Sequence, residues 1–195
     1  MKKVILIATV LLGFTAATMA QVFNTGLTIA QGDFSVGINP VYEDIGDGRT
    51  TFFFYGGYGV ASNVDLAFHY DYRDGEKNDY IGADVEINLF RDKFSASVAA
   101  GGHLKGDNLG FDGILTLSLP IVNGVEPFTG LDSDWDLVDV IENGEEKTEI
   151  RGRLWIPLGV DITIHKDFAL IIEADIKASE LAYNIFGGGL VFYIR

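Results

Sequence analysis

The chain has 195 residues, contains no cysteine and carries a formal net charge of −14 at pH 7. This length predicts one domain, and a hydrophobic content of 48% excludes a disordered chain. The lack of cysteine excludes disulfides, thiolate zinc sites and redox dithiols. The acidic balance disfavours nucleic acid as a partner, because its phosphates would be repelled.

Residues 1–20 have the pattern of a secretory signal peptide. Lys2 and Lys3 precede an apolar stretch from Val4 to Ala17, and small residues around Ala20 offer a cleavage point before Gln21. A membrane anchor is the alternative, but spanning a bilayer as a helix takes about 20 apolar residues. The sequence therefore predicts a signal peptide over 1–20, a mature domain over 21–195 and a place in a bacterial cell envelope.

Alternation with a period of two residues recurs through the rest of the chain. In the segment 64–72, the even positions are large and apolar or aromatic, whereas the odd positions are acidic, small or histidine. This pattern is typical of strands with one polar and one apolar face. It predicts ten strands, at 34–42, 50–60, 64–72, 79–90, 94–103, 108–119, 125–131, 151–164, 168–177 and 184–194. Eight strands are the alternative, because 50–60 and 125–131 alternate poorly.

The expected connections also alternate in length, which indicates an up-and-down antiparallel meander. Short turns are expected at 61–63, 91–93, 121–124 and 165–167. Longer charged connections are expected at 43–49, 73–78, 104–107, 132–150 and 178–183. Residues 21–33 form either a short extra strand or a tail inside the barrel.

Periodicity alone does not say which face of the strands meets which solvent. Three features favour apolar faces that contact lipid: strands of nine or more residues, the same amphipathic pattern in nearly every strand, and aromatic residues near the strand ends. The aromatic residues concerned are Tyr70, Tyr72, Phe90, Phe94, Phe168, Phe192 and Tyr193. The alternative is a soluble, secreted lipocalin-like β-barrel that binds an apolar ligand in its interior.

With its signal segment, alternating strands and terminal strand from Phe186 to Arg195, the chain resembles small bacterial outer-membrane β-barrel proteins. The resemblance implies an all-β fold, a closed antiparallel up-and-down transmembrane β-barrel in the bacterial outer membrane. It also implies outer-membrane lipid and the barrel-assembly machinery as partners. No cofactor is implied, and the ligand is unknown.

In a membrane barrel, the polar faces of the strands line the lumen. The charged residues expected there form either an ion-pair network or, because acids outnumber bases, a narrow pore that prefers cations. They are Asp65, His69, Asp71, Asp84, Glu86, Asp112, Arg151, Arg153, Asp161, Glu173, Asp175 and Lys177. The expected function is that of a structural barrel or a minor passive channel without catalysis.

No catalytic residue and no metal ligand is assigned from the sequence. His69, with Asp65 and Asp71 on the same strand face, suggests an outer-membrane enzyme as a third hypothesis, but a lumen hydrogen bond explains this histidine as well. His103 and His165 lack metal-ligand spacing. The stretch 132–150 is expected to be a solvated acidic loop, with weak divalent-cation binding as the alternative because its calcium-loop pattern is incomplete.

Overall fold

The computed structural model describes residues 28–72, 80–142 and 144–195. The expected signal peptide at 1–20, residues 21–27 of the expected tail or extra strand, and the expected connection at 73–78 lie outside the described residues. Ten strands are present: β1 (Phe34–Glu43), β2 (Arg49–Ala61), β3 (Val64–Tyr72), β4 (Tyr80–Arg91), β5 (Ser95–Lys105), β6 (Asn108–Ser118), β7 (Val125–Glu142), β8 (Glu145–His165), β9 (Phe168–Lys177) and β10 (Ile185–Ile194). The expected count of ten strands is thus confirmed.

The strands form a closed antiparallel up-and-down barrel, which confirms the expected fold class. Each strand pairs with its sequence neighbours, and β1 closes the barrel on β10. The closing register places Phe34 opposite Ile194 and Tyr42 opposite Phe186. Closure leaves no sheet edge exposed within the barrel wall, which is the requirement for strands in lipid, where no water can satisfy a free backbone group. No helix among the described residues is long and apolar enough to cross a membrane.

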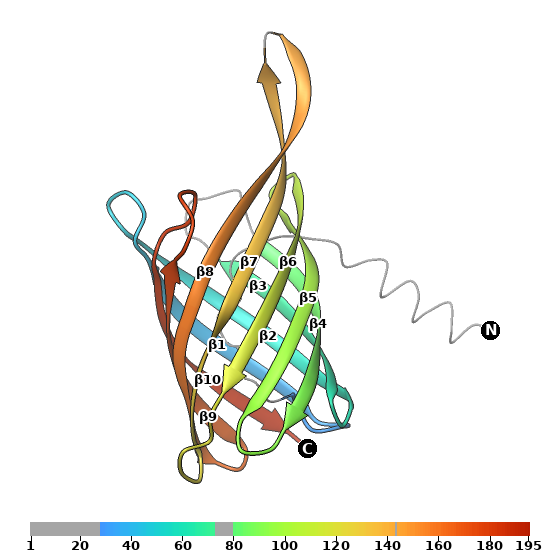
Figure 1. The fold of residues 1–195 in the computed structure, drawn as a ribbon, viewed down its shortest axis with the longest axis vertical. Helices are drawn as coiled ribbons and strands as arrows, with labels where there is room; N and C mark the ends of the chain where they lie inside the picture. The colour runs from blue at the N-terminus through green and yellow to red at the C-terminus, as the bar shows by residue number, and fades with distance from the viewer. Residues whose placement is uncertain (1–27, 73–79, 143) are drawn as a thin grey trace, which may run out of the picture.

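The two ends of the barrel differ (Figure 1). We call the end with the β2–β3, β4–β5, β6–β7 and β8–β9 connections the turn end; the C-terminus also lies there. At the opposite end, β7 and β8 project well beyond the other strands as a long twisted hairpin. We call this the hairpin end.

The expected loop at 132–150 is wrong. β7 continues to Glu142, β8 begins at Glu145, and the two strands stay paired from Leu137 opposite Ile150 out to that tip. The acidic residues do not break the strands. Asp132, Asp134 and Asp136 keep the period of two along β7, and the acids farther along the hairpin stand in solvent beyond the barrel. The connection expected at 104–107 is also shorter than expected, because β5 and β6 are joined by Gly106 and Asp107 alone. Gly106 has a φ of 60°, a conformation that suits glycine.

The side-chain alternation places apolar groups outside and polar groups inside. Leu115, in the middle of β6, is 41% exposed, whereas Asp132 on the neighbouring β7 is 2% exposed. A soluble barrel would have the opposite arrangement, with its aliphatic side chains in a dry centre. The soluble lipocalin-like alternative is therefore wrong.

Residues 28–33 lie against the inner wall of the barrel near the turn end. The Ile29 amide donates a hydrogen bond to Asp65 Oδ2 (2.7 Å), and the Gly32 amide donates one to the Gly59 carbonyl (2.8 Å). A Cβ on Gly59 would overlap the backbone of Ala30. Glycine on the inner face of β2 therefore makes room for this segment, which matches the internal tail and not the extra strand.

Candidate functional site

The interior of the barrel is the candidate site, because it holds buried acids in unusual number. Among the described residues, eleven carboxylate side chains are buried, and no lysine or arginine is. The eleven are Glu43, Asp65, Asp71, Asp84, Glu86, Glu126, Asp132, Asp134, Asp136, Glu173 and Asp175. Charges withdrawn from bulk water need counter-ions, protons, bound water or hydrogen bonds, so this interior favours cations.

Two arginines offset a small part of that charge. Arg49 forms an ion pair with Glu43 near the hairpin end, and its side chain is 26% exposed. Arg153 forms ion pairs with Asp134 (2.7 Å) and with Asp136. The interior therefore keeps a large acidic excess after these pairs are formed.

The acids are unevenly distributed around the lumen. Ten of the eleven come from β3, β4, β7 and β9, whereas the inner faces of β1, β2 and β10 carry mainly small, aliphatic or aromatic residues. An apolar cluster inside the barrel is formed by Val41, Phe53, Tyr80, Phe128, Trp155, Ile171, Ala182, Ile185 and Val191. This cluster narrows the lumen and gives the barrel a packed core of its own.

Each mouth of the barrel opens into a cavity. The cavity at the turn end has a volume of about 350 Å³, and its lining includes Arg91, Lys166 and Arg195 as well as Glu126 and Asp161. The cavity at the hairpin end has a volume of about 300 Å³ and is lined by Lys105, Asn108, Asp136, Val138, Arg151, Arg153 and Leu181. Basic side chains thus stand at the mouths, while the buried centre is acidic.

The β9–β10 connection folds inward at the hairpin end. Trp155, which is 1% exposed, donates a hydrogen bond from its indole N–H to the Tyr183 carbonyl (2.7 Å), and the two rings meet edge to face. Ala182 is also buried. Trp155 therefore anchors this connection over part of the mouth.

His69 is buried and bound to one acid. Its Nε2 lies 2.6 Å from Asp84 Oδ2 on the neighbouring β4. Asp71, on the same strand face as His69, accepts a hydrogen bond from the Tyr80 amide (2.9 Å). Asp65 accepts a hydrogen bond from the Ile29 amide. The acids on the histidine's own strand thus serve backbone groups.

His103 is the centre of a second cluster, on β5, β6 and β7. Its ring is 1% exposed, and its Nδ1 lies 2.8 Å from Asp112 Oδ2. Its Nε2 faces Asp134 Oδ1 (3.6 Å) and Asp136 Oδ1 (3.5 Å). The ring reaches β7 across β6 because Gly110, opposite His103 in the register, has no side chain; a Cβ there would overlap the imidazole.

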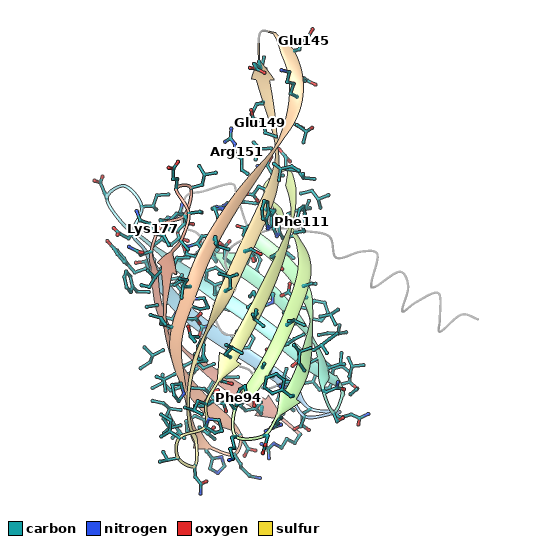
Figure 2. The ribbon with its side chains drawn as sticks, in the orientation of Figure 1. Phe94, Phe111, Glu145, Glu149, Arg151 and Lys177 are labelled. Carbon is teal, nitrogen blue, oxygen red and sulfur yellow. The ribbon has the colours of Figure 1, made fainter. Side chains whose placement is uncertain are left out.

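The predicted lumen residues fall into three groups. Seven of them are buried: Asp65, His69, Asp71, Asp84, Glu86, Glu173 and Asp175. Asp112, Arg153 and Asp161 are half-buried, whereas Arg151 and Lys177 are exposed at the hairpin end, with Arg151 at the base of the projecting hairpin (Figure 2). Of these twelve, the structure brings together His69 with Asp84, Asp84 with Asp112, and Glu173 with Asp175. It also pairs Arg153 with acids that were not predicted.

Sequence reasoning missed several interior groups, namely Glu43, His103, Glu126, Asp132, Asp134 and Asp136. Three of them had a usable signal, because Asp132, Asp134 and Asp136 alternate with Ser133 and Trp135 as strictly as the acids of β3 do. Their assignment to a loop hid that signal.

The outer surface carries two aromatic belts around an aliphatic band. Near the turn end lie Phe34, Phe90, Phe94 and Phe192, and near the hairpin end lie Tyr42, Phe52, Tyr72, Phe111, Trp135 and Phe186; Figure 2 labels Phe94 and Phe111 at the two levels. Aromatic residues concentrate at membrane interfaces in this way. Tyr193, expected in a belt, instead points inward and packs on the apolar cluster.

No family model matches the chain. No curated protein matches it either. Among solved structures, the KdgM porin in complex with disordered oligogalacturonate aligns with 83% of this chain and 99% of its own, at 9% identity and a TM-score of 0.51. The N-terminal β-barrel domain of Pseudomonas aeruginosa OprF aligns with 85% of this chain and 100% of its own, at 14% identity and a TM-score of 0.42.

The fold, the lipid-facing band and the polar interior together define an integral membrane β-barrel of the bacterial outer-membrane type. The similarity to the KdgM porin concerns the fold, since the identity is 9%. The expected resemblance to outer-membrane β-barrel proteins is therefore confirmed at the level of the class, with outer-membrane lipid as its surroundings.

Proposed function

We propose that this protein is a minor passive channel of the outer membrane that prefers small cations and catalyses no reaction. The observation that carries the proposal is the acidic excess inside the barrel: eleven buried carboxylates, with no buried lysine or arginine among the described residues. Carboxylates that line a pore attract cations and repel anions. The basic residues at the mouths, including Arg153, which pairs with Asp134 and Asp136, are too few to reverse the charge of this interior.

The size of the barrel supports a narrow pathway. Barrels of about eight strands are filled by side chains, and wider barrels leave progressively more space. Here ten strands enclose an apolar cluster as well as the acids, and a cavity stands at each mouth. The expected conductance is accordingly small, far below that of a wide porin.

The proposal also includes how the protein reaches and enters the outer membrane. Residues 1–20 direct secretion as a signal peptide, the domain from 21 to 195 is inserted by the barrel-assembly machinery, and lipid surrounds the aliphatic band. Nucleic acid is no partner, because the net charge of −14 repels phosphates.

The absence of catalysis is supported by the surroundings of His69. Its Nε2 is engaged with Asp84 inside the wall, while Asp65 accepts a hydrogen bond from the Ile29 amide and Asp71 accepts one from the Tyr80 amide. General acid–base work requires a histidine within hydrogen-bond reach of a substrate proton. If His69→Ala abolished a hydrolytic activity of the purified protein, the enzyme hypothesis would replace this proposal.

The test is the reversal potential of purified, folded protein in a planar lipid bilayer under a KCl gradient. We expect small currents with cation preference, and a weaker preference in Asp132→Asn, which removes a buried carboxyl group of the lumen. Asp139→Asn is the control, because Asp139 lies on the exposed hairpin and is bound to Thr148 there. An anion preference, or a preference that both variants change equally, contradicts the proposal.

A purely structural barrel is the second candidate. The apolar cluster and the segment 28–33, which occupies the lumen near the turn end, favour it. Folded protein that carries no current at all would support this candidate against the channel.

A further inference from the structure

We infer that His103, Asp134 and Asp136 form a binding site for one divalent transition-metal ion, with zinc as the representative ion. Nitrogen from histidine and oxygen from carboxylates are donors that zinc accepts, and a three-ligand site leaves at least one position for water or another group. The inference concerns a site inside the wall of β5 to β7 and does not depend on the channel proposed above.

The first argument is the donor geometry. Nε2 of His103, Oδ1 of Asp134 and Oδ1 of Asp136 all lie within 4.8 Å of one another. The nitrogen is 3.6 Å from the first oxygen and 3.5 Å from the second. Tetrahedral ligands at zinc bond lengths of 2.0–2.1 Å stand about 3.3 Å apart, so the two nitrogen–oxygen distances need only a small adjustment to share an ion, and the two oxygens must come to about the same separation.

The second argument is the unpartnered nitrogen. His103 Nε2 is buried and has no hydrogen-bond partner, and the same holds for Asp134 Oδ1. Nδ1 of the ring is bound to Asp112, which as a carboxylate accepts the ring proton. In that tautomer Nε2 presents a lone pair to two carboxylate oxygens, an arrangement that is repulsive until a proton or a metal cation stands between them.

The third argument is the outer set of contacts. A carboxylate that accepts the second ring N–H of a ligating histidine fixes the tautomer and the ring orientation, and Asp112 does this for His103. Arg153 binds Oδ2 of both Asp134 and Asp136, which leaves the Oδ1 atoms turned toward the histidine. Each donor is thus oriented by a partner that does not compete for the ion.

The fourth argument is charge. With neutral imidazoles, the four carboxylates of Asp112, Asp134, Asp136 and the adjoining Asp84 exceed the two positive charges of Arg153 and the nearby Lys105 by two. A divalent ion neutralises this difference inside the barrel, where unpaired charge is costly.

The position of Gly110 makes the site depend on backbone register. His103, Gly110 and Asp136 lie in one row across β5, β6 and β7, and the imidazole covers the glycine. A methyl group at this position would push the ring out of the row. By contrast, a Cβ on Gly113 of the same strand would meet Ser133 Oγ at 3.7 Å, an ordinary contact.

The test is zinc binding by the full chain, folded in detergent, stripped with a chelator and titrated with ZnCl₂ by calorimetry. We expect one zinc ion per chain. In His103→Ala and in Asp112→Asn, the affinity for zinc should fall by about 10-fold to 100-fold or more. His69→Ala is the matched control, because His69 is also a buried histidine and its partner Asp84 is not one of the three proposed ligands. Asp132→Asn is a second control, since it removes a neighbouring acid that is not a ligand.

Gly110→Ala tests the geometry without removing a donor, with Gly113→Ala as its control. We expect the first variant to bind zinc weakly and the second to bind it as the wild type does. Co²⁺ gives an independent readout, because its visible absorption reports the coordination number. Folding of each variant is checked by the mobility of unheated and heated samples on gels, and Asp136→Asn replaces any variant that does not fold.

Two results overturn the inference. One is the lack of stoichiometric zinc binding by the wild type. A proton on His103 Nε2 would then be the positive charge that faces the two carboxylates. The other is zinc binding that His103→Ala leaves unchanged or that His69→Ala and Asp132→Asn reduce equally, which would indicate diffuse attraction by the acidic interior.

Discussion

The outer and inner faces of the same ten strands obey opposite rules. On the outer face, aliphatic side chains around the barrel have similar exposed fractions, as Val85 (42%), Leu115 (41%) and Leu158 (49%) illustrate. On the inner face, Asp84, Asp132 and Asp175 are each 5% exposed or less. In lipid, the outer face requires only apolar surface, whereas the inner face must satisfy each polar group individually. Tolerance to mutation should differ accordingly.

The largest effect is expected at Trp155, inside the barrel. Trp155→Ala removes a buried ring that contacts Tyr183 and stands beside the Arg153 guanidinium, so it should lower the free energy of unfolding by about 3–5 kcal/mol. Trp135→Ala, on the lipid-facing surface, should lower it less, because lipid replaces the lost contacts. Urea unfolding in vesicles measures both values, and equal losses would contradict the difference between the faces.

A charge on the lipid face should have the next largest effect. Leu115→Arg places a guanidinium near the middle of the aliphatic band, and the expected cost is about 2–4 kcal/mol of folding stability. Ile141→Arg is the control, because Ile141 is 79% exposed on the projecting hairpin, where water is available. If both arginines were equally harmless, the band would not face lipid.

Gly59→Ala tests the space inside the wall at the turn end. The added methyl group would overlap the Ala30 backbone and displace residues 28–33, at an expected cost of about 1–3 kcal/mol. Hydrogen exchange of the Ile29 and Gly32 amides should become faster, since both amides donate to groups that the segment would leave.

Gly56→Ala is the matched control on β2. A Cβ there would meet the Ser35 carbonyl at 3.8 Å, an ordinary distance. Unchanged exchange in Gly59→Ala would show that the segment does not depend on the inner face of β2.

The smallest effect is expected on the hairpin outside the barrel. Lys147 and Glu142 form an ion pair there, and both side chains are more than half exposed. Lys147→Ala should therefore change the unfolding free energy by less than about 0.5 kcal/mol in the same urea experiment. A loss as large as that of Leu115→Arg would mean that the hairpin is part of the cooperative core.

The sidedness of the strands could be predicted from sequence because it depends on a period of two, which each strand carries by itself. β3 shows this, since Asp65, His69 and Asp71 alternate with residues on the outer face. β7 carries the same pattern through Asp132, Asp134 and Asp136, but its high local charge predicts a loop after residue 131. Charge in a strand is tolerated when the face that carries it looks into a polar lumen.

The partners inside the lumen could not be predicted, because they depend on register between strands. Nothing in the spacing of His103, Gly110 and Asp136 indicates that they form one row. Likewise, His69 has two acids on its own strand but contacts Asp84 of the next one. Pairing of this kind follows from how the barrel closes, which no single segment determines.

The central claim, that the aliphatic face meets lipid while the acid-bearing face looks inward, can be tested with the two tryptophans of the chain. In Trp155→Phe only Trp135 of the outer belt remains, and in Trp135→Phe only Trp155 of the interior remains. In vesicles of phospholipids brominated on their acyl chains, the fluorescence of the first variant should be strongly quenched and that of the second nearly unaffected. Strong quenching of Trp155 with none of Trp135 would contradict the arrangement described above.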